Sequence, residues 1–558
     1  MVLINYKMNR RFLVVLFAVS ALTFGACKKN KVEPNPTPDP PVTPPTTTAT
    51  RQQLSLDSIF LYAKEVYYWN DKLPTYAAFN PRQYSSLSTD LLNYEKALFE
   101  ITKYSNPGEW KSGATSSKFS YISDKTTENP STTGFVLDKS LAVNLEGNGN
   151  DIGLRVVPYL TNSTTRSYLL FVTAVYDKSP AMLAGMKRGM VITKVNGTAI
   201  GAHYENERTN LNSQLGQNVV NLEGRGYIDN VTFTKSLTKA VYTKSSPVYA
   251  QKVYNTGSKK IGYFAMARFS RLSTASTNNP ADVNLDAAFA EFSNKGVTDL
   301  IIDLRYNGGG YIQTAEHLIN LIAPTSTNGK VMFSEHYNNT MQNNQATILQ
   351  HQAIPDENGK AQFFNGKLVT YFDYKTNPYS LANNTVNFRK KGSLDGIQNV
   401  VFLVTGSTAS ASELVINSLK PYLNVKVVGA TTYGKPIGFF PIVIENRYKV
   451  YFSMFDTRNS LGQGAYYDGI KPDPAYDEDL DASGDIWDDP RYDFGDVKEG
   501  YLAAALKILA PGATITTEKA RATMSVQGQT ISVKNLQKMA PVKDDSFVGM
   551  IEDRHGKK

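Results

Sequence analysis

The pattern of apolar and polar positions changes character along the chain after residue 50. Residues 51–134 contain stretches such as LDSIFLYAKEVYYW and DLLNYEKALFEITKY, with apolar positions at helical spacing. Residues 135–245 contain short apolar runs separated by Gly, Asn and Ser, a pattern typical of strands. In residues 246–475, buried-strand patterns alternate with amphipathic helices. We therefore predict a small helical N-terminal domain, a β-rich domain and an α/β core.

The regular alternation of the α/β core is interrupted once and then ends. The predicted strands are IGYFAMARF, VTDLIIDL, NVVFLVTG and NVKVVGATTYG, and the predicted helices are LDAAFAEFSNKG, YIQTAEHLINLI and ASELVINSLKPY. Residues 325–398 are rich in Asn, Gln and Tyr, which predicts a loop-rich insertion. Residues 476–558 are interpreted as an acidic linker, solvated over residues 477–496, followed by a weakly patterned C-terminal extension.

The first fifty residues predict export and attachment to a membrane. Residues 1–27 end with MNRRFLVVLFAVSALTFGAC, in which two arginines precede an apolar run and small residues precede Cys27. This is the pattern of a secretory signal, and its end resembles a bacterial lipobox, with Phe24 where Leu is usual. The alternative is a plain signal peptide with an incidental cysteine. Residues 28–50 are Pro- and Thr-rich and predict an extended tether. We expect a lipid-anchored protein of the cell envelope, on the outer membrane facing the periplasm or the cell surface.

Charge and composition exclude several partners. The formal net charge of +9 is modest for 558 residues, and no Lys/Arg cluster is interleaved with aromatic residues, so no nucleic-acid partner is predicted. Cys27 is the single cysteine, and the five histidines have no metal-ligand spacing. The acidic stretch lacks the glycine and terminal glutamate of an EF-hand loop. We therefore predict neither a metal nor a cofactor.

A recognisable motif lies in the β-rich domain. The sequence SPAMLAGMKRGMVITKVNGTAI predicts a short helix after Pro180, a strand from Gly189 and a tight turn at Asn196-Gly197. This resembles the PDZ fold, which implies binding of extended peptides at a sheet edge. The alternative is a β-domain without a ligand. The candidate residues for binding a peptide carboxylate are Gly153, Leu154, Arg155 and Val156.

Two turns of the α/β core each follow a predicted buried strand and open a helix. The first turn, DLRYNGGG, includes Gly309 and Gly310, whose unhindered amides could stabilise an oxyanion. The same glycines would also suit a bare tight turn. The second turn, STASASE, places Ser410 at a strand-to-helix bend, as in a nucleophile elbow. The spacing from Ser410 to Glu413 also fits a capping box, in which the serine has no catalytic role.

A lysine follows the strand after the serine helix, in the sequence TYGK. Lys435 could act as a general base only if burial among apolar neighbours kept its amine neutral near pH 7. The alternative is a solvated surface lysine. Tyr433, Pro436 and Phe439 are among the nearby residues that could exclude water from the amine.

Together these motifs resemble the carboxy-terminal processing (tail-specific) peptidase family. They occur in the order DLR.N.GG, TASASE and T.GK, followed by GIKPD at residues 469–473. The resemblance implies a multidomain α/β protein with a crotonase-like ββα core, a PDZ-like domain and a helical N-terminal domain. It implies a serine endopeptidase that cleaves unfolded proteins or exposed C-terminal tails without a cofactor. By this resemblance Ser410 is the nucleophile, Lys435 the general base, and the amides of Ala411 and of Gly309 or Gly310 the oxyanion hole.

One position departs from the family pattern and keeps alternatives open. Many members have a glutamine four residues after the lysine, where this chain has Phe439. Another group could orient Lys435, or His317 or His336 could assist the serine instead. A catalytically lapsed ligand- or peptide-binding lipoprotein on the same fold is the main alternative function. An acyl-CoA enzyme of the crotonase type is disfavoured by the export signal.

Overall fold

The computed structural model describes residues 49–105, 108–126, 143–257, 259–273, 279–356, 360–513, 516–517, 536–538 and 549–552. All but one of these residues belong to one compact unit, Thr50–Lys558. The predicted signal, Cys27 and nearly all of the predicted tether lie outside the described residues. No helix among the described residues is long and apolar enough to cross a membrane.

The N-terminal region is helical, as predicted, and then joins the core through a strand. Helix α1 (Arg51–Val66) begins at a capping box on Thr50, and α2 (Tyr76–Phe79) and α3 (Asp90–Thr102) follow. Strand β1 (Tyr121–Asp124) pairs antiparallel with β22 (Tyr448–Tyr451), more than 300 residues later in the chain. This pairing holds residues of the N-terminal region against the core, including the loop that contains Lys435.

The β-rich domain, residues 143–242, is built on a largely antiparallel sheet. Its order is β25-β3-β4-β5-β7-β8, with β6 paired to β5. The strands are β3 (Leu154–Leu160), β4 (Tyr168–Val175), β5 (Met190–Val195), β6 (Thr198–Ala199), β7 (Val219–Gly226), β8 (Thr232–Thr238) and the distant β25 (Gln537–Lys538). Helices α4 (Pro180–Leu183) and α5 (Tyr204–Leu215) lie within it, and β2 (Gly149–Asp151) pairs with β9 (Ala240–Tyr242). The predicted Asn196-Gly197 turn is confirmed, because both residues have positive φ between β5 and β6.

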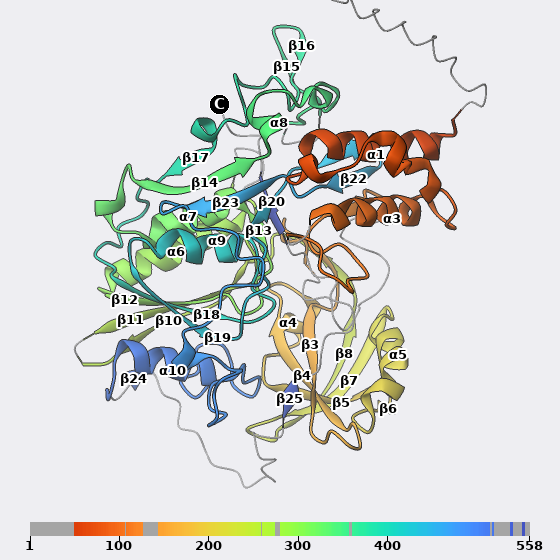
Figure 1. Ribbon diagram of the computed structural model, residues 1–558. Coiled ribbons are helices and arrows are strands. Elements are labelled where there is room, and N and C mark those ends of the chain that lie inside the picture. Colours follow the sequence, from red (N-terminus) through yellow and green to blue (C-terminus); the bar gives the residue numbers. More distant parts are fainter. Residues whose placement is uncertain are drawn as a thin grey trace, which may run out of the picture. The chain divides into compact units, whose positions relative to one another are not determined.

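A six-stranded sheet forms the centre of the α/β core, in the order β19-β18-β12-β11-β10-β24 (Figure 1). The strands are β10 (Val248–Asn255), β11 (Lys260–Met266), β12 (Asp299–Asp303), β18 (Asn399–Val404), β19 (Asn424–Gly429) and β24 (Thr516–Thr517). The four strands β11, β12, β18 and β19 are parallel. Their predicted positions in the sequence are confirmed. Because they are parallel, the turns that follow β12 and β18 meet at one edge of the sheet.

Helices cover both faces of this sheet (Figure 1). The helices α6 (Pro280–Asn294), α7 (Ile312–Ile322) and α9 (Ala411–Leu419) share one buried apolar cluster with alternate residues of β12 and β18. Helix α10 (Gly500–Leu509) shares a second cluster with the intervening residues of the same strands. Strands buried on both sides explain the nearly continuous apolar runs in VTDLIIDL and NVVFLVTG.

Residues 325–398 are loop-rich, as predicted, but they also contain the seven-residue strand β14 (Val331–Tyr337). It joins β17 (Thr385–Asn387), β23 (Phe455–Asn459) and β20 (Ile437–Gly438) in a second sheet. The strand is hard to see in the sequence because the buried side chains include a charged one, Glu335.

The prediction that residues 477–496 form a solvated acidic linker is wrong. Asp488 and Asp489 are in fact buried, with 3% and 1% of their surfaces exposed. Burying a carboxylate is costly unless it is paired, and both are paired with arginines. The segment therefore contributes to the interior of the protein rather than acting as a solvated spacer.

Candidate active site

Ser410 occupies a strained turn between β18 and α9. Its backbone has φ 61° and ψ −111°, a region that residues other than glycine rarely adopt. The residue has no exposed surface, and its Oγ has no hydrogen-bond partner among the described residues. Ser410 and Glu413 occupy the positions of a capping box, as the sequence indicated, but the Ser410 hydroxyl makes no helix-cap hydrogen bond. A strained backbone that presents an unpartnered hydroxyl is the geometry of a displayed nucleophile.

Glu413 connects this turn to the lysine loop. Its buried carboxylate accepts hydrogen bonds from the Ser410 amide at 2.7 Å and from the Gly434 and Lys435 amides at 2.8 Å each. The Thr432 hydroxyl donates to the same carboxylate. One oxygen, Oε2, binds the amides of both Ser410 and Lys435. The sequence indicated only a capping box here, whereas the structure shows that Glu413 holds the two candidate catalytic residues in a common frame.

Lys435 is completely buried, and this controls its acidity. Desolvation by burial lowers the pKa of Lys435 to about 7, although the carboxylates of Glu109 and Glu413 oppose the change. Its Nζ donates a hydrogen bond to the Phe119 carbonyl oxygen at 3.2 Å and lies 4.4 Å from the centre of the Phe439 ring. The amine is therefore partly neutral at physiological pH, which a general base requires.

The N-terminal region supplies part of the surroundings of Lys435. The Phe119 amide donates to the Glu109 carboxylate at 3.0 Å, and that carboxylate also accepts from the Tyr67 and Ser453 hydroxyls. This buried cluster fixes the carbonyl that binds the Lys435 amine. Phe119 thus contacts the Lys435 amine through its carbonyl oxygen, while the ring of Phe439 packs against the same amine.

The glycine turn lies directly beside Ser410. Gly309 and Gly310 have φ values of 109° and 139°, and a Cβ built on Gly309 would lie 3.0 Å from Ser410 Cβ. The Gly309 amide donates to Asn307 Oδ1 at 3.0 Å. The Ala411 amide, at the first position of α9, has no acceptor among the described residues. Of the predicted oxyanion donors, the Gly309 amide is thus already engaged, while the Ala411 amide is available.

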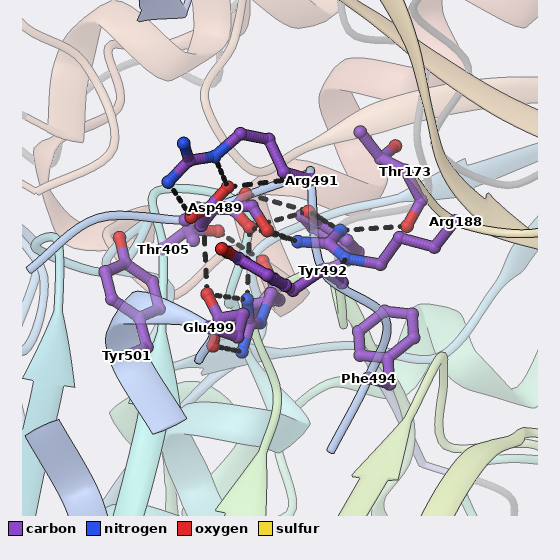
Figure 2. Close-up of polar contacts among 12 residues, drawn as sticks. Thr173, Arg188, Thr405, Asp489, Arg491, Tyr492, Phe494, Glu499 and Tyr501 are labelled. Carbon is purple, nitrogen blue, oxygen red and sulfur yellow. Dashed lines mark hydrogen bonds and ion pairs between the residues drawn. The ribbon is translucent and has the colours of Figure 1, made fainter. Parts of the chain in front are cut away.

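Figure 2 shows a network of buried polar and charged side chains that includes Arg188, Asp489 and Glu499. The Arg305 guanidinium binds the carboxylates of Asp303, Asp488 and Glu499 at 2.8 to 3.1 Å. Arg188, from the β-rich domain, binds Asp488 at 3.0 Å. Each buried cation is therefore matched by carboxylates, as burial of charge requires. The network links the glycine turn, the β-rich domain and the segment after residue 476.

The four residues predicted to bind a peptide carboxylate are mostly packed inside the protein. Leu154 and Val156 belong to the apolar core of the β-rich domain, and a Cβ on Gly153 would collide with Ser179. Arg155 Nη1 donates to Thr173 Oγ1 at 2.7 Å, and its guanidinium lies 3.9 Å from the centre of the Tyr306 ring. Arg155 thus faces the glycine-turn residue Tyr306, and the peptide-binding role of this loop stays a prediction.

The histidines and acidic residues do not form an alternative centre in the described part of the chain. His317 Nε2 lies 2.6 Å from Asp286 Oδ1, and His336 Nε2 lies 2.9 Å from Ser334 Oγ. Burial lowers the pKa of His336, with a further contribution from Arg458. Neither histidine is a partner of Ser410 Oγ. The described residues include no group of three His, Cys, Asp or Glu side chains suited to a metal ion.

Comparison with known proteins finds a family model that matches part of the chain. Residues 260–475 match the model of peptidase family S41.

The curated relatives that match this chain at low identity have the names of peptidases. The chain is 20% identical over 308 residues to the "Probable CtpA-like serine protease" of Staphylococcus aureus strain N315, a match that covers 55% of this chain and 50% of the relative. It is 27% identical over 266 residues to the "C-terminal processing peptidase, chloroplastic" of Tetradesmus obliquus, covering 46% of each. The chain thus spans about half the length of these relatives.

A solved structure shares the fold. The crystal structure of an S41 protease from Bacteroides fragilis NCTC 9343 aligns with a TM-score of 0.51 at 22% identity, covering 84% of this chain and 98% of the other. The mixed α/β fold predicted from the sequence is therefore that of an S41 protease.

Proposed function

We propose that this chain is a serine endopeptidase that cleaves unfolded or C-terminally exposed proteins with a Ser410–Lys435 pair. One observation carries the proposal: a completely buried lysine, its pKa lowered to about 7, shares the Glu413 carboxylate with a serine whose Oγ is unpartnered. A solvated surface lysine would not have its pKa lowered by burial. A serine that only caps a helix would use its hydroxyl in the cap hydrogen bond.

The proposed mechanism assigns a step to each of these groups. Neutral Lys435 accepts the proton of Ser410 Oγ as this oxygen attacks the scissile carbonyl carbon, giving a tetrahedral oxyanion. The Ala411 amide, together with an amide of the glycine turn, donates hydrogen bonds to that oxyanion. Protonated Lys435 then gives its proton to the leaving amine, and the acyl-enzyme forms. The same lysine next removes a proton from water, which hydrolyses the ester bond to Ser410.

Features of the first fifty residues support the proposal that this protein is located at the cell envelope. The apolar run ending at Cys27 supports export and lipid attachment, and the Pro/Thr-rich residues 28–50 support a tether between the lipid and the folded unit. Protein substrates would then be those of the periplasm or cell surface. The β-rich domain is proposed to be a PDZ-like module that binds such substrates.

The test uses the full mature chain from Cys27 with casein and a fluorophosphonate probe that labels activated serines. We expect casein to be cleaved, the probe to attach to Ser410 as located by mass spectrometry, and labelling to block cleavage. Attachment at another serine, or cleavage that persists after complete labelling of Ser410, would contradict the proposal. Binding of casein without cleavage or labelling would support the lapsed peptide-binding lipoprotein instead.

The pH dependence of cleavage should show the titration of Lys435. Only the neutral amine can accept a proton from Ser410, and burial lowers the pKa of Lys435 to about 7. We therefore expect kcat/KM to fall about tenfold for each pH unit below 7 and to level off above about pH 8. Rates measured from pH 5 to 9, with circular dichroism to verify folding at each pH, check this. A profile that is flat between pH 6 and 9 would show that a group of lower pKa serves as the base.

A further inference from the structure

The described C-terminal residues of the chain lie in the candidate active site. Strand β26 (Gly549–Ile551) pairs in parallel with β13 (Gly309–Tyr311), the strand formed by the glycine turn. The Gly549 amide donates to the Gly308 carbonyl at 3.1 Å. On its other side, the Phe439 amide donates to the Met550 carbonyl and the Glu552 amide donates to the Phe439 carbonyl, both at 3.1 Å. Residues 549–552 thus form a strand between the glycine turn and the loop of Lys435.

This strand passes next to the nucleophile. A Cβ on Gly309 would lie 3.0 Å from Ser410 Cβ and would collide with the Gly549 carbonyl oxygen. Gly549 and Ser410 therefore both lie next to the Cα atom of Gly309, and only a glycine at position 309 leaves room for both. With residues 549–552 in place, neither Ser410 nor Lys435 has exposed surface.

The backbone of the glycine turn is suited to pair with an extended peptide segment at this edge. The Gly309 carbonyl accepts from the Phe269 amide, and the Tyr311 amide donates to the Phe269 carbonyl, both at 2.9 Å. Backbone groups of successive strand residues point to opposite edges, so those of Gly310 point away from Phe269, toward β26. A peptide added at this edge completes the sheet, as in recognition by strand addition.

Two side chains of the segment enter the protein. Met550 has no exposed surface and belongs to the large apolar cluster of the core. Glu552 is 2% exposed, and its Oε2 accepts a hydrogen bond from the Tyr337 hydroxyl at 2.9 Å. Residues 550 and 552 point to the same side of the strand. The groove therefore provides an apolar pocket and, two residues later, a hydroxyl donor.

From this geometry we propose that residues 549–552 occupy the substrate groove as an intramolecular pseudosubstrate. The inference rests on the proposed peptidase function, and it adds the conformation and side-chain types of the peptide that the groove binds. The groove takes an extended peptide parallel to β13, with a large apolar side chain in the Met550 pocket and an acceptor side chain at Tyr337. Because the segment is part of the same chain, it competes at high effective concentration, and a substrate must displace it.

The test compares cleavage kinetics of the full chain and of Met550→Asp, which places a charge in the apolar pocket. If the segment fills the groove in about 90% of molecules, freeing the groove lowers KM about tenfold and leaves kcat unchanged. The control is Leu480→Asp, which adds the same charge at a side chain that is 66% exposed. A chain ending at residue 548, with one ending at Glu552 as its control, serves if Met550→Asp does not fold.

A direct binding measurement separates this inference from the proposed function. Fluorescein-labelled Gly-Met-Ile-Glu should bind the Ser410→Ala chain that ends at residue 548, and bind at least tenfold more weakly to the Ser410→Ala full chain, by fluorescence polarisation. Equal KM values for Met550→Asp and Leu480→Asp, or no peptide binding to the shortened chain, would overturn the inference. If casein is not cleaved and Ser410 is not labelled, the proposed function fails. The peptide-binding measurement still shows in that case whether residues 549–552 occupy the groove.

Discussion

Replacement of Ser410 by alanine is expected to reduce kcat/KM for casein by about three to six orders of magnitude. The substitution removes one oxygen from a side chain that is fully buried and makes no hydrogen bond within the described residues, so folding should be little affected. Lys435→Ala should cause a loss of similar size, because the proposed mechanism uses the two residues as one unit in proton transfer. The measurement is casein cleavage by the purified full chains, with thermal unfolding recorded for each.

The matched control for this prediction is Ser407→Ala, three residues earlier in the same turn. Its activity should stay within about twofold of the native chain, because only a group in contact with reacting atoms carries a large kinetic effect. Loss of activity in Ser410→Ala alone, with Lys435→Ala still active, would assign the general base to another residue. Full activity in Ser410→Ala would rule out the mechanism.

Replacement of Glu413 is expected to have the second largest effect, on both stability and rate. In Glu413→Ala, the amides of Ser410, Gly434 and Lys435 lose their acceptor inside the protein. Each unsatisfied buried amide costs about 1–3 kcal/mol, so with three amides we expect the free energy of unfolding to fall by at least about 3 kcal/mol. Denaturant unfolding measures this loss, and Glu291→Gln on the exposed side of α6 is the control.

Glu413→Gln distinguishes positioning from folding. The amide retains one acceptor oxygen and the size of the side chain, so the fold should survive, while kcat falls on the order of a hundredfold as the Ser410 and Lys435 loops lose their common anchor. The Glu413 carboxylate also raises the pKa of Lys435. Removing its charge should therefore shift the rise of kcat/KM to lower pH. An unchanged pH profile would contradict a role for Glu413 in the electrostatics of Lys435.

The sequence predicted the elements that depend on local periodicity, and it placed Ser410, Lys435 and the glycine turn through the order of three motifs. It could not show Phe119 as the partner of the Lys435 amine, because these residues are 316 positions apart and no spacing rule links them. It assigned the acidic residues around Asp488 to solvent, since composition alone does not indicate that an arginine elsewhere will pair with a carboxylate.

The C-terminal strand was missed for a related reason. Residues 549–552 lie in a weakly patterned region and include only two large apolar side chains, too few to indicate a strand. Their conformation is set by the edge of β13 and by Phe439, both distant in sequence. Such tertiary control of local structure is the usual limit of reasoning from pattern alone.

The buried charge network also dictates the order in which the protein can be completed during synthesis. Arg305 leaves the ribosome 183 residues before Asp488 and 194 before Glu499. Until both carboxylates have emerged, Asp303 is the only carboxylate partner of Arg305 in this network, and burial would leave Arg188 without a carboxylate and guanidinium N–H donors without acceptors. We therefore expect the glycine turn to take its final form only afterwards. A recombinant fragment ending at residue 475, where the family match stops, would have the same defect. On the proposed mechanism, activity of Ser410 and Lys435 is therefore expected only after translation has passed Lys435 by more than sixty positions.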